Sequence, residues 1–89
     1  MVSVLITTFN SASVLEPCLN SLFEQDYPSI EIIIVDNASS DGTLEILQRI
    51  GRGVRIFYNK DNRGFAGGQN QGMAEARGDW LLSLNPDVI

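Results

Sequence analysis

The chain has 89 residues and a formal net charge of −5, with 6 Lys and Arg against 11 Asp and Glu, and it contains no histidine. A chain of this length forms one small domain or part of one, and its few, scattered basic residues exclude the positive surface expected of a nucleic-acid-binding protein. The absence of histidine excludes the commonest general base, Ser–His and Cys–His catalytic pairs, and imidazole metal sites.

The single cysteine and the hydropathy pattern indicate a cytoplasmic, soluble chain. Cys18 has no partner for an internal disulfide, and its place among Leu15, Leu19 and Leu22 predicts a small buried hydrophobe. The apolar runs have the length of strands, and the N-terminus lacks the basic start and long apolar stretch of a signal peptide. In a longer protein, we expect this part to lie in the cytoplasm, at the inner face of the membrane.

The first strand and helix are predicted at the N-terminal end. Residues 2–7 are apolar and rich in β-branched side chains, and they open into a polar loop at 8–11. Ser13 and Glu16 have the spacing of a capping box at the start of a helix. The apolar face of that helix comprises Leu15, Leu19, Leu22 and Phe23.

A second strand and helix follow. A turn at 26–29 precedes the continuous apolar run 30–35, which is typical of a strand covered on both faces. Residues 43–50 then predict a helix, capped by Ser40 or Asp41. Its expected inner face comprises Leu44, Leu47 and Ile50, and Gly51 ends it.

The remaining pattern completes a β-α-β-α-β-α-β order. We predict a strand at 54–58, a short helix from Gly67 or Gly68 to Ala76 that Gly78 terminates, and a strand at 80–84. This alternation predicts an α/β fold with a Rossmann-like parallel sheet and right-handed crossovers, built from about four strands and three helices. Because no closing helix follows the last strand, we expect a fragment of a longer protein with that strand near a sheet edge.

Polar residues follow each predicted strand. They are Thr8 and Asn10 after the first, Asp36 and Asn37 after the second, residues 59–62 after the third, and Asn85 and Asp87 after the fourth. Since parallel strands share one direction, these loops lie along one edge of the sheet, where open α/β sheets bind ligands. Asp36 is the most informative of them, because it is a carboxylate at the end of an apolar strand.

Two common nucleotide motifs are absent. Residues 7–12 contain no glycine, which excludes the Gly-x-Gly-x-x-Gly loop of a dinucleotide-binding domain. The glycine-rich stretch 64–72 lacks the Gly-Lys-Ser/Thr ending of a P-loop. It is either a flexible loop that offers helix N-terminal amides to an anion, or a run of glycines required for tight turns and close helix packing.

The Asn85-Pro86-Asp87 turn also has two interpretations. Proline fixes the backbone here, so that Asp87 can present one carboxylate to a hard cation. Mg²⁺ or Mn²⁺ commonly takes one or two carboxylates together with substrate phosphates and waters. The alternative is a solvated turn in which Asn85 is the first residue.

Taken together, four segments resemble family 2 glycosyltransferases of the GT-A fold, especially the bacterial rhamnosyltransferase-type members. The segments are residues 4–10 (VLITTFN), 27–43 (which include YP and EIIIVDNASSDGT), 62–72 (NRGFAGGQNQG) and 78–87 (GDWLLSLNPD). They cover nearly the whole chain in the expected order. The resemblance implies that residues 1–89 are the N-terminal nucleotide-sugar-binding part of a GT-A domain, truncated after an Asp-x-Asp-like motif.

The resemblance also implies roles for individual residues. Thr8, Phe9 and Asn10 would contact the base and ribose of a nucleotide sugar, and Asp36 would accept the N3–H of uracil or thymine. The nucleotide site would further include Asn37, Arg63, Gly64 and Asn70. Asn85 and Asp87 would hold Mg²⁺ or Mn²⁺ at the Asp-x-Asp position. Asn37 and Asn85 stand where many family members have Asp, and the acidic catalytic base would lie after Ile89, so no catalytic residue is assigned in this chain.

The function that follows is donor binding in an inverting, metal-dependent glycosyltransferase. Its partners would be a dTDP- or UDP-linked sugar and a glycan or lipid-linked acceptor, as in cell-wall polysaccharide biosynthesis, and not nucleic acid. We expect the fragment alone to transfer no sugar and to self-associate through its incomplete sheet. A non-catalytic nucleotide-sugar-binding domain is an alternative. A receiver-like signalling module is another, although it requires acids where Thr8, Phe9 and Asn10 stand.

Overall fold

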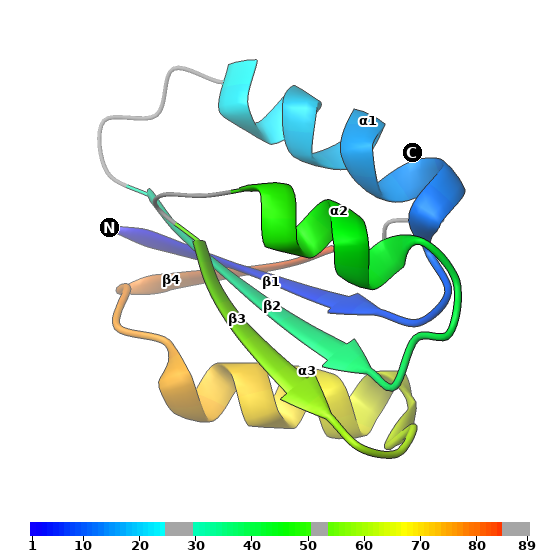
Figure 1. Ribbon diagram of the computed structural model, residues 1–89. Coiled ribbons are helices and arrows are strands. Elements are labelled where there is room, and N and C mark those ends of the chain that lie inside the picture. The colour runs from blue at the N-terminus through cyan, green and yellow to red at the C-terminus, as the bar shows by residue number, and fades with distance from the viewer. Residues whose placement is uncertain (25–29, 51–53, 85–89) are drawn as a thin grey trace.

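Strands and helices alternate through the residues that the computed structural model describes, which are 1–24, 30–50 and 54–84. In chain order they are β1 (Val2–Thr8), α1 (Ala12–Glu24), β2 (Ile30–Asn37), α2 (Thr43–Ile50), β3 (Val54–Asn59), α3 (Gly64–Glu75) and β4 (Trp80–Leu84) (Figure 1). The predicted order and the α/β class are therefore confirmed. The predicted turn at 26–29, the helix stop at Gly51 and the Asn85-Pro86-Asp87 turn lie outside the described residues.

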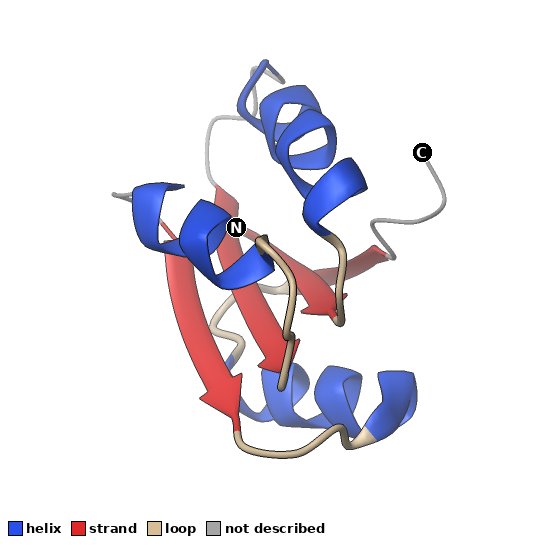
Figure 2. Ribbon diagram, turned by 45° about the vertical axis from the view of Figure 1, so that its right-hand side comes forward, coloured by secondary structure: helices blue, strands red, loops and turns tan. Residues whose placement is uncertain are grey.

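The four strands form one parallel sheet in the order β3-β2-β1-β4. Because the chain returns from β3 to the far side of β1, α3 lies on one face of the sheet while α1 and α2 lie on the other (Figures 1 and 2). β4 is an edge strand, as predicted. The carboxyl ends of β1 and β2 lie in the middle of the sheet, with Thr8 in register with Asp36.

The main core lies between the sheet and the α1–α2 layer. The buried side chains are Val4, Ile6, Ile32 and Ile34 from the strands and Leu15, Leu19, Ile46 and Leu47 from the helices. Ile46 takes a place that the sequence assigned to Leu44, which is only partly buried. Cys18 is buried as predicted, and burial raises the pKa of its thiol.

The start of α1 differs from the prediction. The helix begins at Ala12, so Ser13 lies in its first turn and the predicted capping box is wrong. The carbonyl of Ser11 accepts the N–H groups of the first turn, and the Asp41 carboxylate accepts the Ala12 N–H at 3.2 Å. A side chain 29 residues away therefore supplies a cap that a local sequence pattern does not reveal.

Asp41 also caps α2, as one of the two predicted alternatives. Its Oδ1 accepts the Thr43 N–H at 2.9 Å and the Thr43 hydroxyl. The Thr43 hydroxyl and the N–H groups of Thr43 and Ala12 hold the pKa of the Asp41 carboxyl below its ordinary value. One carboxylate thus fixes the starts of both helices on this face of the sheet.

The glycine-rich stretch forms a helix instead of a flexible loop. α3 begins at Gly64, three residues before the earliest predicted start, and the Asn62 side chain accepts the Gly64 N–H at 2.8 Å. A Cβ at Gly68 would lie 2.5 Å from Thr7 Cγ2, and one at Gly72 would lie 3.4 Å from Leu5 Cδ2. At Gly68, the absence of a Cβ therefore lets α3 approach β1 closely, which was the second of the two interpretations.

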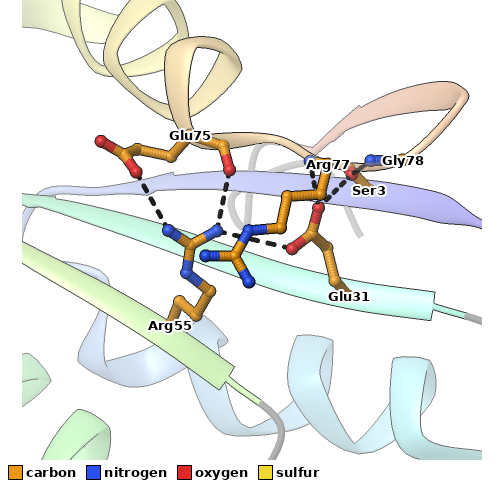
Figure 3. Close-up of polar contacts among 6 residues, drawn as sticks. All are labelled: Ser3, Glu31, Arg55, Glu75, Arg77 and Gly78. Carbon is orange, nitrogen blue, oxygen red and sulfur yellow. Dashed lines mark hydrogen bonds and ion pairs between the residues drawn. The ribbon is translucent and has the colours of Figure 1, made fainter.

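A polar network at the amino ends of the strands holds the connection from α3 to β4 (Figure 3). It comprises Ser3, Glu31, Arg55, Glu75, Arg77 and Gly78. Glu31 Oε2 accepts the Ser3 hydroxyl and the Arg77 N–H, both at 2.6 Å, and Ser3 Oγ accepts the Gly78 N–H at 2.8 Å.

Arg55 completes this network from β3. Its guanidinium donates to the carbonyl of Glu75 at 2.8 Å and to the Glu75 carboxylate at 3.0 Å, and it lies 3.5 Å from Glu31 Oε1. The end of α3 is thereby tied to β1, β2 and β3.

Among residues 1–24, 30–50 and 54–84, no helix is long and apolar enough to span a membrane.

Candidate functional site

The carboxylate of Asp36 lies inside the carboxyl edge of the sheet, between the loops that follow β1 and β2. Its Oδ1 accepts the hydroxyls of Thr8 and Ser39, both at 2.6 Å, and its Oδ2 accepts the Ser39 N–H at 3.1 Å. The residue is 1% exposed. Since a carboxylate offers about four acceptor positions, one position on Oδ2 has no donor among the residues that the structure describes.

Hydrogen bonds join the loop after β1 to the loop after β2. Asn10 adopts a left-handed backbone conformation (φ 48°), which asparagine tolerates better than most residues. Its N–H donates to Ser39 Oγ at 2.9 Å, and its side-chain oxygen accepts the Ser40 N–H at 2.7 Å. Asn10 thus holds the loop, while the neighbouring Phe9 side chain projects with 47% of its surface exposed.

Asn37 points to the opposite face of the sheet from Asp36, toward α3, because side chains alternate along a strand. Its Nδ2 donates to the Gly64 carbonyl at 2.9 Å, and its Oδ1 accepts from Asn59 Nδ2 at 2.8 Å. Asn59 in turn exchanges hydrogen bonds with the Gln71 side chain at 3.0 and 3.1 Å. The Asn37 amide is therefore fixed by both β3 and the first residue of α3.

A cavity of about 210 Å³ opens at this edge of the sheet. Its lining comprises Thr7, Phe9, Ser11, Asn37, Asn62, Gly64 and Phe65. Three predicted nucleotide-binding residues, Phe9, Asn37 and Gly64, line it directly.

Other predicted residues lie beside the cavity instead of in its wall. Thr8 and Asp36 are buried in the sheet edge, and Asn10 belongs to the loop that carries Phe9. Arg63 and Asn70 are exposed, and the Arg63 side chain lies 3.7 Å from Asp61. Their roles toward a nucleotide stay predictions.

Sequence reasoning missed Thr7, Ser11 and Phe65 as site residues. In the sequence, Thr7 precedes Thr8 and Ser11 follows Asn10, and Phe65 lies in the family-like segment 62–72. Phe65 directly follows Gly64, the first residue of α3. Because the sequence predicted that this helix begins at Gly67 or Gly68, it did not place Phe65 at the helix start beside the cavity.

The two residues predicted to hold a metal, Asn85 and Asp87, lie outside the described residues. Within the described ranges 1–24, 30–50 and 54–84, no group of three Asp, Glu or Cys side chains is arranged to hold a metal ion.

Comparisons with known proteins agree with this geometry. A model of the family described as Glycosyl transferase family 2 matches residues 3–89. TuaG of Bacillus subtilis, a glycosyltransferase ascribed to teichuronic acid biosynthesis, is 33% identical over 90 residues, which cover 98% of this chain and 36% of TuaG. The chain therefore spans little more than a third of the length of this relative.

Two solved structures superpose closely on the chain. S. aureus TarS 1-349 in complex with UDP-GlcNAc has a TM-score of 0.90 and 30% identity, over 97% of this chain and 26% of the TarS 1-349 chain. The mannosyltransferase PcManGT from Pyrobaculum calidifontis, in complex with GDP-Man and Mn²⁺, has a TM-score of 0.90 and 30% identity, over 97% of this chain and 27% of PcManGT.

Proposed function

This chain belongs to glycosyl transferase family 2, and on that premise we propose that it binds the nucleotide part of a nucleotide-diphosphate sugar for a glycosyltransferase. The observation that carries the proposal is the cavity at the carboxyl edge of the sheet, where Phe9, Asn37 and Gly64 meet beside the buried Asp36. The solved relatives support it, because TarS holds UDP-GlcNAc and PcManGT holds GDP-Man.

In this proposal Asp36 selects the base of the donor. A carboxylate accepts the N3–H of uracil or thymine but meets only an acceptor at N3 of cytosine, and a buried unpaired polar group costs about 1–3 kcal/mol. We propose a UDP- or dTDP-linked donor. Since Asp36 is 1% exposed, base contact requires that the free position on Oδ2 becomes accessible or that the Ser39 hydroxyl leaves Oδ1.

Neighbouring residues complete the proposed donor site. Thr8, Phe9 and Asn10 serve the base and ribose. Arg63 faces the base or the diphosphate, and Gly64 and Asn70 belong to the same nucleotide site. Asn85 and Asp87 would hold Mg²⁺ or Mn²⁺, a proposal supported by the Mn²⁺ in PcManGT. When bound to both phosphates, such an ion offsets the charge that develops on the leaving group.

For the longer protein we propose inverting transfer to a hydroxyl of a glycan or lipid-linked acceptor, in the cytoplasm at the inner membrane face. The similarity to TuaG supports a role in cell-wall polysaccharide synthesis. We also propose that the longer protein is a rhamnosyltransferase-type member of the family. The present chain would bind the donor without transferring the sugar. We also propose that the chain self-associates through its β4 edge.

Isothermal titration calorimetry with UDP, dTDP and GDP, each with Mn²⁺, tests the donor site. We expect binding of UDP or dTDP, and we expect Asp36→Asn to weaken it about 10- to 100-fold, because hydrogen bonds to a charged group contribute about 1.5–3 kcal/mol. Asp79→Asn is the matched control, since Asp79 is an exposed acid at the amino ends of the strands and pairs with the N-terminus at 3.5 Å. We expect it to bind like the unmodified chain.

The result that would overturn the proposal is a chain that is folded by circular dichroism yet releases no heat with any of the three nucleotides. Equal binding by the unmodified chain and Asp36→Asn would remove Asp36 from the site while leaving donor binding in place.

A further inference from the structure

Two exposed phenylalanines line the same cavity from separate segments of the chain. Phe9 lies in the loop after β1, and Phe65 is the second residue of α3. Their exposed fractions are 47% and 50%. Large aromatic side chains gain free energy by leaving water, so two half-exposed rings beside one cavity form a surface that a flat apolar partner would cover.

The size of the cavity limits what it encloses. Pockets that bury a whole drug-sized ligand have about 300–1,000 Å³, whereas this cavity has about 210 Å³. It is therefore suited to one ring system of a nucleotide sugar, with the phosphates and the sugar outside.

We infer that Phe65 forms, with Phe9, the aromatic walls of a slot for the nucleobase of the donor. This inference rests on the proposed function. Phe65 then contributes affinity by stacking. Selection among the bases stays with Asp36.

The test compares Phe65→Leu with Trp80→Leu in calorimetric titrations with UDP and with uridine. Trp80 is a suitable control because it is an exposed aromatic residue (72%) that begins β4, at the amino ends of the strands, and does not line the cavity. Stacking on an aromatic side chain contributes enough that Phe65→Leu should weaken UDP binding about tenfold. Uridine, which lacks the phosphates, should lose affinity by the same factor, and Trp80→Leu should change neither.

A second variant gives an independent readout. Phe65→Trp should retain UDP affinity, and its added indole fluorescence should be quenched as the base stacks on it. Unchanged UDP binding in Phe65→Leu, or no quenching in a Phe65→Trp chain that binds UDP, would overturn the inference and leave the proposed function standing. A loss confined to UDP and absent with uridine would also overturn it, because it would place Phe65 at the phosphates. A folded, unmodified chain that binds no nucleotide would instead overturn the proposed function.

Discussion

Glu31 shows how one side chain couples the stability of this sheet to pH. Its carboxylate, 13% exposed, accepts the Ser3 hydroxyl and the Arg77 N–H and faces the Arg55 guanidinium. The Ser3 hydroxyl above all, and then the Arg77 N–H and Arg55, hold the pKa of Glu31 below its ordinary value. A carboxyl whose pKa is lower in the folded state binds fewer protons there, so its contribution is complete well above about pH 4.3 and is lost as the pH falls through the folded-state pKa.

We therefore predict that Glu31→Gln lowers the free energy of unfolding at pH 7 by about 1–3 kcal/mol, because the partners of a partly buried charged acceptor are left with a weaker one. The difference between the variant and the unmodified chain should shrink as the pH falls from 5 to 3. Urea denaturation at a series of pH values measures it, with the exposed Glu45→Gln on α2 as the control. A difference that stays constant over this range would contradict the assigned role of the Glu31 charge.

At the scale of elements, the packing of α3 on the sheet depends on glycine at particular positions. A Cβ at Gly68 would approach Thr7 Cγ2 to 2.5 Å and Thr7 Oγ1 to 2.9 Å, which requires a strand residue or the helix to move. At Gly72 the nearest atom would be Leu5 Cδ2 at 3.4 Å, an ordinary contact with the flexible end of a side chain.

We predict opposite effects for these two positions in the same helix. Gly68→Ala should lower stability by about 1–3 kcal/mol through overpacking, whereas Gly72→Ala should be neutral or raise stability by up to about 1 kcal/mol, because alanine favours the helix. Thermal and urea unfolding of both variants measure the effects. Equal changes in the stability of the two variants would show that the absence of a Cβ at Gly68 is not what permits the close approach of α3 to β1.

At the scale of the whole molecule, the β4 edge stands out. Parallel sheets are normally covered on both faces, yet Trp80, Leu81 and Leu82 are 72%, 51% and 42% exposed. Within the described sheet, β4 pairs only with β1, so its other edge offers unpaired backbone groups. A second copy of the chain can cover this edge by pairing β4 with β4 around a two-fold axis.

Self-association is therefore the expected behaviour of the 89-residue chain. Light scattering should show a mass that rises with concentration, and Leu81→Lys should shift the chain toward the monomer, since a charge on an edge strand opposes pairing. Gln48→Lys is the control, because it adds the same charge at an exposed position of α2, on the face of the sheet opposite α3 (Figure 1). A monodisperse monomer of the unmodified chain at all concentrations would contradict this prediction.

The sequence by itself determined the α/β class, the order of the elements and the membership of the chain in its family. Buried strands and helix faces are predicted from the spacing of apolar residues along the chain. Examples are the apolar run 30–35 and the leucines Leu15 and Leu19, four residues apart. The sequence also determined which polar residues follow the strands, since a β-α alternation places all strand ends at one edge.

The tertiary structure decided what depends on contacts between distant segments. It placed the cap of α1 on Asp41, started α3 at Gly64, and turned Asp36 and Asn37 to opposite faces of the sheet. It also brought Phe65 to the cavity that Phe9 lines, although 55 residues separate them in the chain. The physical reason is that caps, helix approach and cavities are set by the packing of segments far apart in sequence, and local propensity carries no record of that packing.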